Sequence, residues 1–142
     1  MLNTLLLSSS IVISSIIMSY TIYNVFNNKK QKSRKILCTS SNIYFITDID
    51  NENKIILYNN NNEQIYPHLE RNTMEIYFDR KENKENVLYF YLSNYKNKNI
   101  ITIEDDFLYP LNEDKEINVL QVKNNKFYML KNFIYGTEFT II

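Results

Sequence analysis

The chain of 142 residues contains one glycine, one cysteine, one histidine, two prolines and no tryptophan. With Gly136 as the only glycine, it has no phosphate-binding loop, dinucleotide fingerprint or G-x-S-x-G nucleophile elbow. Cys38 has no second cysteine to form an intrachain disulfide with, and Cys38 and His68 alone are too few for a Cys/His zinc site. We therefore expect no enzyme activity, no cofactor and no metal.

Charge is absent from the first 28 residues, which contain no Asp, Glu, Lys, Arg or His. The 23 residues of 4–26 are enough to cross roughly 30 Å of hydrocarbon at about 1.5 Å per residue. A cluster of five cations follows at once: Lys29, Lys30, Lys32, Arg34 and Lys35. The pattern predicts a transmembrane anchor over 1–28 and a basic juxtamembrane flank over 29–35 that contacts lipid head groups.

A cleaved signal peptide is the main alternative to this anchor. It normally begins with a basic segment and ends with small residues at an A-x-A-like site, and neither feature is found here. The cations on the C-terminal side instead predict a single-pass protein whose C-terminal domain is cytosolic at synthesis.

Small polar residues fall within a narrow arc of the predicted helix: Thr4, Ser8, Ser15 and Ser19. Such a face allows a second transmembrane helix to approach closely, so it is a candidate packing surface for another membrane protein. The alternative is that these hydroxyls bond only to their own helix backbone.

Composition limits what the remaining chain can do. Residues 36–142 contain all 16 acidic residues and 11 basic ones, a net charge of −5, which makes nucleic acid a poor partner. Asn, Ile, Lys and Tyr account for 67 of the 142 residues and alanine is absent, as expected of a very AT-rich genome. We therefore give the Asn and Lys runs no functional weight.

Short runs of β-branched and aromatic residues recur through 36–142, separated by polar turns. The predicted strands are 42–47, 54–59, 63–66, 73–79, 87–92, 100–104, 117–123, 126–131 and 137–142. We expect one turn at 67–72 and a polar connection at 93–99. The sequence predicts one all-β domain, an antiparallel β-sandwich or partly open barrel of about eight to nine short strands.

Asparagine replaces glycine as the turn residue, since it tolerates the left-handed conformation better than other residues with a side chain. Asn124-Asn125 predicts a two-residue hairpin that pairs Lys123 with Lys126 and Leu120 with Met129.

Two further groups of residues suggest chemistry or binding. The run Asp48 to Glu52 resembles the start of a calcium loop, but Asn53 stands where a glycine is needed, so solvated turn residues are the simpler interpretation.

The chain has 12 Tyr and 8 Phe, a result of codon bias or of a binding patch. Our candidate patch is Phe107, Leu108 and Tyr109, which could dock a partner protein.

These patterns predict a membrane-anchored structural or interaction protein, a subunit of a membrane-bound complex. Its most specific form is a virion envelope or entry-complex component of a large AT-rich DNA virus. The alternative is a cellular or organellar membrane-associated β-sandwich module that binds a peptide or a lipid. We expect a lipid bilayer and other membrane proteins as partners, with no nucleic acid and no small-molecule substrate.

Overall fold

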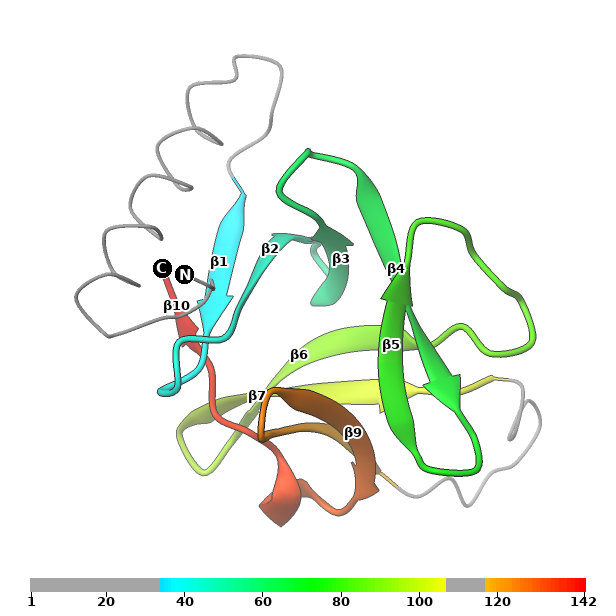
Figure 1. The fold of residues 1–142 in the computed structure, drawn as a ribbon. Coiled ribbons are helices and arrows are strands. Elements are labelled where there is room, and N and C mark those ends of the chain that lie inside the picture. The colour runs from blue at the N-terminus through cyan, green and yellow to red at the C-terminus, as the bar shows by residue number, and fades with distance from the viewer. Residues whose placement is uncertain (1–33, 107–116) are drawn as a thin grey trace.

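The structure is a computed structural model that describes residues 34–106 and 117–142. This part of the chain is all-β, with ten strands and one short 3₁₀ turn (Figure 1). The strands are β1 (Lys35–Cys38), β2 (Tyr44–Ile49), β3 (Lys54–Tyr58), β4 (Gln64–Glu70), β5 (Glu75–Asp79), β6 (Tyr89–Tyr95), β7 (Lys98–Glu104), β8 (Asn118–Lys123), β9 (Lys126–Lys131) and β10 (Thr140–Ile141). The 3₁₀ turn η1 covers Phe133–Tyr135.

Strand β3 closes the sheet into a barrel because it pairs with three other strands. One of its edges pairs with β2. The other edge is divided: Lys54 and Ile55 pair with β6, whereas Leu57 and Tyr58 pair with β4. The antiparallel ring β3-β4-β5-β9-β8-β7-β6 therefore returns to β3 as a seven-stranded closed barrel. Strands β2, β1 and β10 continue the sheet outward from β3.

The barrel interior is filled by one apolar cluster to which most strands contribute. Its fully buried large side chains include Leu37, Leu57, Leu69, Leu88, Phe90, Ile101, Leu120, Met129 and Phe139. Phe78 packs edge-on against Phe127, with ring centroids 5.1 Å apart, and against Phe90 at 6.4 Å. Edge-to-face pairs of this kind add to the stabilisation from burial. Part of the high aromatic content therefore serves the core.

The outward extension of the sheet has a second, smaller apolar cluster on its opposite face. Ile36 and Ile46 are buried there, although their neighbours Leu37 and Phe45 belong to the main core. This division follows from the period of two along a strand.

Asparagine supplies most of the left-handed backbone, as the sequence predicts. Among the residues that the structure describes, nine other than glycine have positive φ, and seven of them are Asn: Asn42, Asn53, Asn62, Asn97, Asn124, Asn125 and Asn132. The hairpin at Asn124-Asn125 has the predicted register, with Lys123 opposite Lys126 and Leu120 opposite Met129. Both turn residues have positive φ, as a type I′ turn requires.

Several expectations about the strands are wrong. Pro67 does not begin a turn but lies inside β4, opposite Phe78. The expected connection at 93–99 is instead a tight hairpin in which Tyr95 pairs with Lys98 across the turn at Lys96-Asn97. The β1 strand was not predicted, because Lys35 belongs to the basic cluster. The barrel is closed rather than partly open, because the pairing of β3 with β6 joins residues distant in sequence.

The predicted anchor over 1–28 lies outside the described residues, and so do Lys29, Lys30 and Lys32. The packing face Thr4, Ser8, Ser15 and Ser19 and the patch Phe107, Leu108 and Tyr109 also lie outside them. Within 34–106 and 117–142, the structure contains no helix of the length and apolarity needed to span a bilayer. The anchor therefore stays a prediction from the sequence.

The hairpin gives a test of the role of asparagine. Replacing Asn125, whose φ is 63°, with Val forces a β-branched residue into the left-handed region. We expect Asn125→Val to lower the free energy of unfolding by about 1–2 kcal/mol, measured by urea denaturation of the full chain in detergent with circular dichroism. Asn94→Val, at an exposed site in β6 without positive φ, is the control. Equal stability of the two variants would contradict this account.

Candidate functional site

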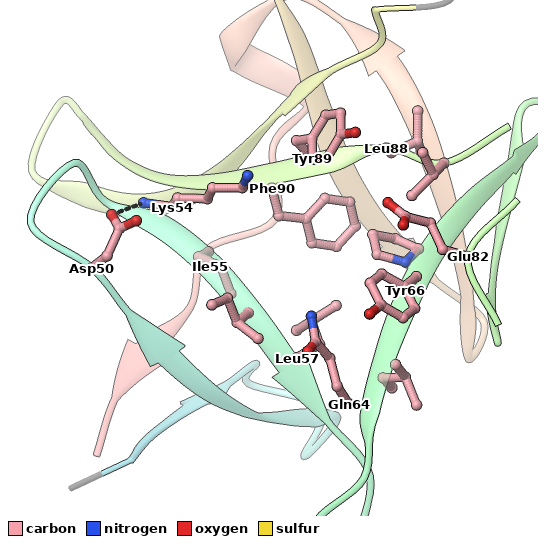
Figure 2. Close-up of a pocket in the computed structure, with 14 residues that line it drawn as sticks. Asp50, Lys54, Ile55, Leu57, Gln64, Tyr66, Glu82, Leu88, Tyr89 and Phe90 are labelled. Carbon is pink, nitrogen blue, oxygen red and sulfur yellow. Dashed lines mark hydrogen bonds between the residues drawn. The ribbon is translucent and has the colours of Figure 1, made fainter. Parts of the chain in front are cut away.

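A cleft opens where the divided edge of β3 lets β4 and β6 separate (Figure 2). Its volume is about 290 Å³. We call this cavity the fork cleft. Its far side is formed by residues 80–88, which connect β5 to β6 and which we call the strap. The fork cleft is thus a gap in the barrel wall surrounded by three strands and one connection.

The strap is held against β4 by backbone hydrogen bonds, which prevent the gap from closing. The N–H of Leu88 donates to the carbonyl of Pro67 at 2.9 Å, and the N–H of Leu69 donates to the carbonyl of Asn86 at 2.9 Å. His68 and Val87 form an isolated β-bridge between these bonds. Along one edge of β4, the strap therefore takes over as the pairing partner beyond the point where β3 ends its pairing.

The floor of the fork cleft is apolar and belongs to the barrel core. It is formed by Ile55, Leu57, Ile65, Leu88 and Phe90. Phe90 is 1% exposed, and its ring points between Ile55, Leu57 and Leu88 in Figure 2. An apolar side chain that entered the cleft would continue the packing of the core and would leave water at little cost.

The rim of the fork cleft is polar. It includes Asp50, Lys54, Gln64, Tyr66, Glu82 and Tyr89. The Nζ atom of Lys54 lies 4.7 Å from the ring centroid of Tyr89, a cation–π contact. Glu82 lies 3.7 Å from the ammonium group of Lys84 on the strap. Lys54 is the one cation among the lining residues, against the two carboxylates of Asp50 and Glu82.

The acidic character extends beyond the rim onto the outer face of β6 and β7. The hydroxyl of Tyr91 donates to Glu104 at 3.1 Å. Burial raises the pKa of Tyr91 to about 12, with further contributions from Glu104, Asp106 and Asp50. Nearby negative charge opposes formation of the phenolate, so the carboxylates at the Lys54 end of the cleft add to the effect of burial.

The run that resembles a calcium loop serves the β2–β3 turn. The Oδ1 atom of Asp50 accepts from the backbone N–H groups of Glu52 at 2.8 Å and Lys54 at 3.0 Å. The Asp50 carboxylate therefore fixes the turn that delivers Lys54 to the rim. The described residues contain no group of three or more Asp, Glu, His or Cys side chains arranged to hold a metal ion.

An ion pair also braces the strap. Arg71, just after β4, donates to both carboxylate oxygens of Asp105, at 2.8 and 3.3 Å, and to the carbonyl of Glu85 at 2.8 Å. The Asp105 side chain is 0% exposed and that of Arg71 is 25% exposed. Arg71 thus links the end of β7, the end of β4 and the strap through one guanidinium group.

The two predicted flank residues that the structure describes belong to the β domain. The Arg34 guanidinium lies 3.5 Å from the Tyr58 ring centroid and donates to Asn62 at 3.3 Å. Its side chain is 9% exposed, which sets it apart from an open cationic flank. Lys35 is exposed and begins β1. Contact of the basic flank with lipid stays a prediction.

The single histidine and the single cysteine both lie on strands. His68 is on β4, with 0% exposure and its ring stacked on Tyr77 at a centroid distance of 5.2 Å. Cys38 is half-buried at the end of β1, and burial raises the pKa of its thiol. A raised pKa makes a thiolate nucleophile less accessible at neutral pH.

Sequence reasoning did not identify the fork cleft. Lys54 and Tyr66 lie in predicted strands and Glu82 in a polar connection, and nothing local distinguishes them from other surface residues. They come together only because β3 pairs with β4 and β6. The alternation of buried and half-buried residues along β3 indicates two faces but gives no sign of a divided edge.

Comparison with protein-family models finds no match, and comparisons with curated proteins and with solved structures find none either. The geometry of the fork cleft is therefore what bears on its function.

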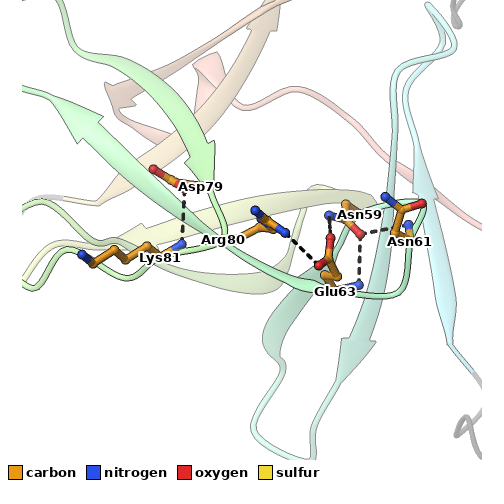
Figure 3. Close-up of polar contacts among 6 residues, drawn as sticks. All are labelled: Asn59, Asn61, Glu63, Asp79, Arg80 and Lys81. Carbon is orange, nitrogen blue, oxygen red and sulfur yellow. Dashed lines mark hydrogen bonds and ion pairs between the residues drawn. The ribbon is translucent and has the colours of Figure 1, made fainter.

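The brace of the strap can be tested by Asp105→Asn. This change removes the negative charge of Asp105 from its buried pair with Arg71, and we expect a loss of about 3 kcal/mol in the free energy of unfolding, measured by chemical denaturation. The matched control is Arg80→Gln, which removes the exposed pair of Arg80 with Glu63, at 2.9 Å (Figure 3). Exposed pairs contribute little, so the control should unfold like the wild type. A small loss for Asp105→Asn would show that Arg71 does not brace the strap.

Proposed function

We propose that the chain is a single-pass, membrane-anchored interaction protein whose β barrel binds an extended, basic segment of a partner protein. The fork cleft is the observation that carries this proposal, because it combines an apolar floor with an acidic rim on a compact barrel. The uncharged stretch of residues 1–28 supports the membrane location.

The size of the fork cleft favours one side chain of a polypeptide over a lipid chain. Its volume of about 290 Å³ lies at the lower end of ligand pockets, which span about 300–1,000 Å³. A lipid tail needs a long, continuous apolar tunnel, whereas this floor ends at polar groups such as Lys54 and Gln64. A peptide can seat one apolar side chain on the floor and leave its backbone at the polar rim.

The charge around the fork cleft favours a basic partner. Asp50 and Glu82 line it, and Glu104 and Asp106 lie near Tyr91 beside it. A segment with Lys or Arg on either side of an apolar residue would complement this surface and would be attracted to it before contact. Residues 36–142 have a net charge of −5, which adds to the attraction.

The proposal has a narrower form, a virion envelope or entry-complex component of a large AT-rich DNA virus. The composition and the uncharged N-terminal stretch support it. The alternative is a peptide-binding module on a cellular or organellar membrane, which the cleft supports equally. Mass spectrometry of purified virus particles would distinguish them, since only the viral form requires the protein to be present there.

The anchor is tested by extraction from membranes. Because residues 1–28 contain no charged side chain, we expect the full chain to remain in the pellet after sodium carbonate or high salt and to dissolve only in detergent. Placing two charges in the middle of the stretch, as Ile13→Lys with Ile16→Lys, should release it because each buried cation costs about 3 kcal/mol. Carbonate extraction of the unmodified chain would refute the anchor.

The fork cleft is tested by narrowing its mouth. Ile56 is half-buried and lines the cleft, so Ile56→Trp should obstruct it, whereas Ile56→Val should not. The probe is a fluorescent decapeptide with a central Phe among lysines, and its affinity is measured by anisotropy. We expect about tenfold weaker binding for Ile56→Trp, equivalent to about 1.4 kcal/mol.

A peptide with glutamates in place of lysines should bind the wild type weakly, and circular dichroism should show that both variants fold. A second control, Ile134→Trp, changes an exposed residue of η1 and should leave binding unaltered. Equal affinity of the wild type and Ile56→Trp would exclude the fork cleft as the binding site.

A further inference from the structure

His68 is a buried titratable group that lies beside the fork cleft without lining it. It is located on β4 with 0% exposure, between Tyr77 of β5 and the strap. One of its ring nitrogens, Nε2, accepts a hydrogen bond of 3.0 Å from the backbone N–H of Asn83. The other, Nδ1, is buried and has no hydrogen-bond partner among the residues described. The bond from Asn83 is thus the one that the ring makes within this part of the chain.

This geometry requires a neutral imidazole. To accept from Asn83, Nε2 must keep its lone pair, so the proton of the neutral ring lies on Nδ1. An imidazolium carries protons on both nitrogens, and its Nε2–H would then face the N–H of Asn83. The hydrogen bond between His68 and the strap cannot survive protonation.

The bond is important because the two halves of the strap are held differently. The second half is fixed to β4 through Asn86 and Leu88 and to Arg71 through the Glu85 carbonyl. For residues 81–84, the bond from Asn83 to His68 is the one hydrogen bond to β4 that the described residues provide. Loss of that bond therefore detaches residues 81–83 from β4, while the carbonyl and the Oδ1 atom of Asn83 still accept from Asn86, Val87 and Glu85 of the second half.

The charged groups that face His68 come from β5 and from the strap. Strand β5 contributes Tyr77 and Asp79, and the strap contributes Lys81, Glu82 and Lys84. These residues and His68 line a shallow depression of about 450 Å³, which brings solvent protons close to the ring. Two carboxylates and two ammonium groups thus lie around the ring, and the contact with Asn83 is the one that requires its neutral form.

We propose that His68 is a proton-operated latch that holds the first half of the strap against β4 when neutral and releases it from β4 when protonated. Glu82 lies in this half and lines the fork cleft, so release displaces the Glu82 part of the wall, whereas Val87 and Leu88 stay in place. Regulation of partner binding by this latch rests on the proposed function, whereas the latch itself does not. An isolated histidine ordinarily changes charge between about pH 5 and pH 8, which sets the range to examine.

Amide hydrogen exchange of the full chain in detergent, followed by mass spectrometry, tests the latch. Exchange is compared at about pH 7.5 and about pH 5, with labelling times scaled to the intrinsic rates, since histidine changes charge between them. We expect protection of residues 80–84 to fall about tenfold at the lower pH, because one hydrogen bond is lost. Protection of the β8–β9 hairpin, Asn118–Lys131, should not change. Unchanged protection of residues 80–84 in the wild type would overturn the proposal.

Two variants at position 68 separate titration from packing. His68→Gln offers a side-chain carbonyl that can accept from Asn83 at either pH, so the strap should stay protected at both. His68→Phe keeps the stacking on Tyr77 but has no acceptor, so the strap should be open at both. A fall in protection for His68→Gln as large as that of the wild type would show that another group titrates.

Binding of the lysine-rich decapeptide at the two pH values separates the latch from the proposed function. We expect its affinity to fall at the lower pH for the wild type and to stay constant for His68→Gln. If the strap opens while the affinity stays constant, the latch stands and the fork cleft is not the binding site. If the peptide binds and the strap does not respond to pH, the latch is refuted and the binding proposal stands.

Discussion

The pairing of Ile55 with Phe90 is the contact on which the architecture depends. It joins β3 to β6 and converts a meandering sheet into a closed barrel, which leaves no free edges around the ring. The same contact divides the edge of β3 that is not paired with β2, and so opens the fork cleft. Closure of the barrel and the presence of the cleft are therefore two results of one pairing, and neither can be changed without the other.

The position of the strap follows from this division. Because β3 pairs with only the first part of β4, the remaining backbone of β4 needs other hydrogen-bond partners, and Asn86 and Leu88 provide them. Pro67, which interrupts hydrogen bonding in most strands, fits here because its carbonyl accepts from Leu88 while no N–H is needed. The segment that satisfies the backbone of β4 is thus also the segment that forms a wall of the cleft.

Local signals in the sequence predict much of the fold but little of the fork cleft. The alternation from Met74 to Asp79 predicted β5, where Ile76 and Phe78 do face the core, and Asn124-Asn125 predicted the β8–β9 hairpin with its register. The hairpin at Lys96-Asn97 was missed because its polar strand residues are held by cross-strand pairing and not by their own propensity. The fork cleft and the burial of His68 depend on contacts between distant segments, for which a single sequence gives no local sign.

The position of Arg34 limits how far the barrel could lie from a membrane. Its stacking on Tyr58 fixes the chain to the fold from residue 34 onward. If residues 1–28 are held in a bilayer, only the five residues 29–33 form the linker between the bilayer and the barrel. A linker of this length can reach about 17 Å when fully extended. A linker of that reach would confine the barrel beside the head groups with a restricted set of orientations. A partner would then have to approach the barrel close to the membrane surface.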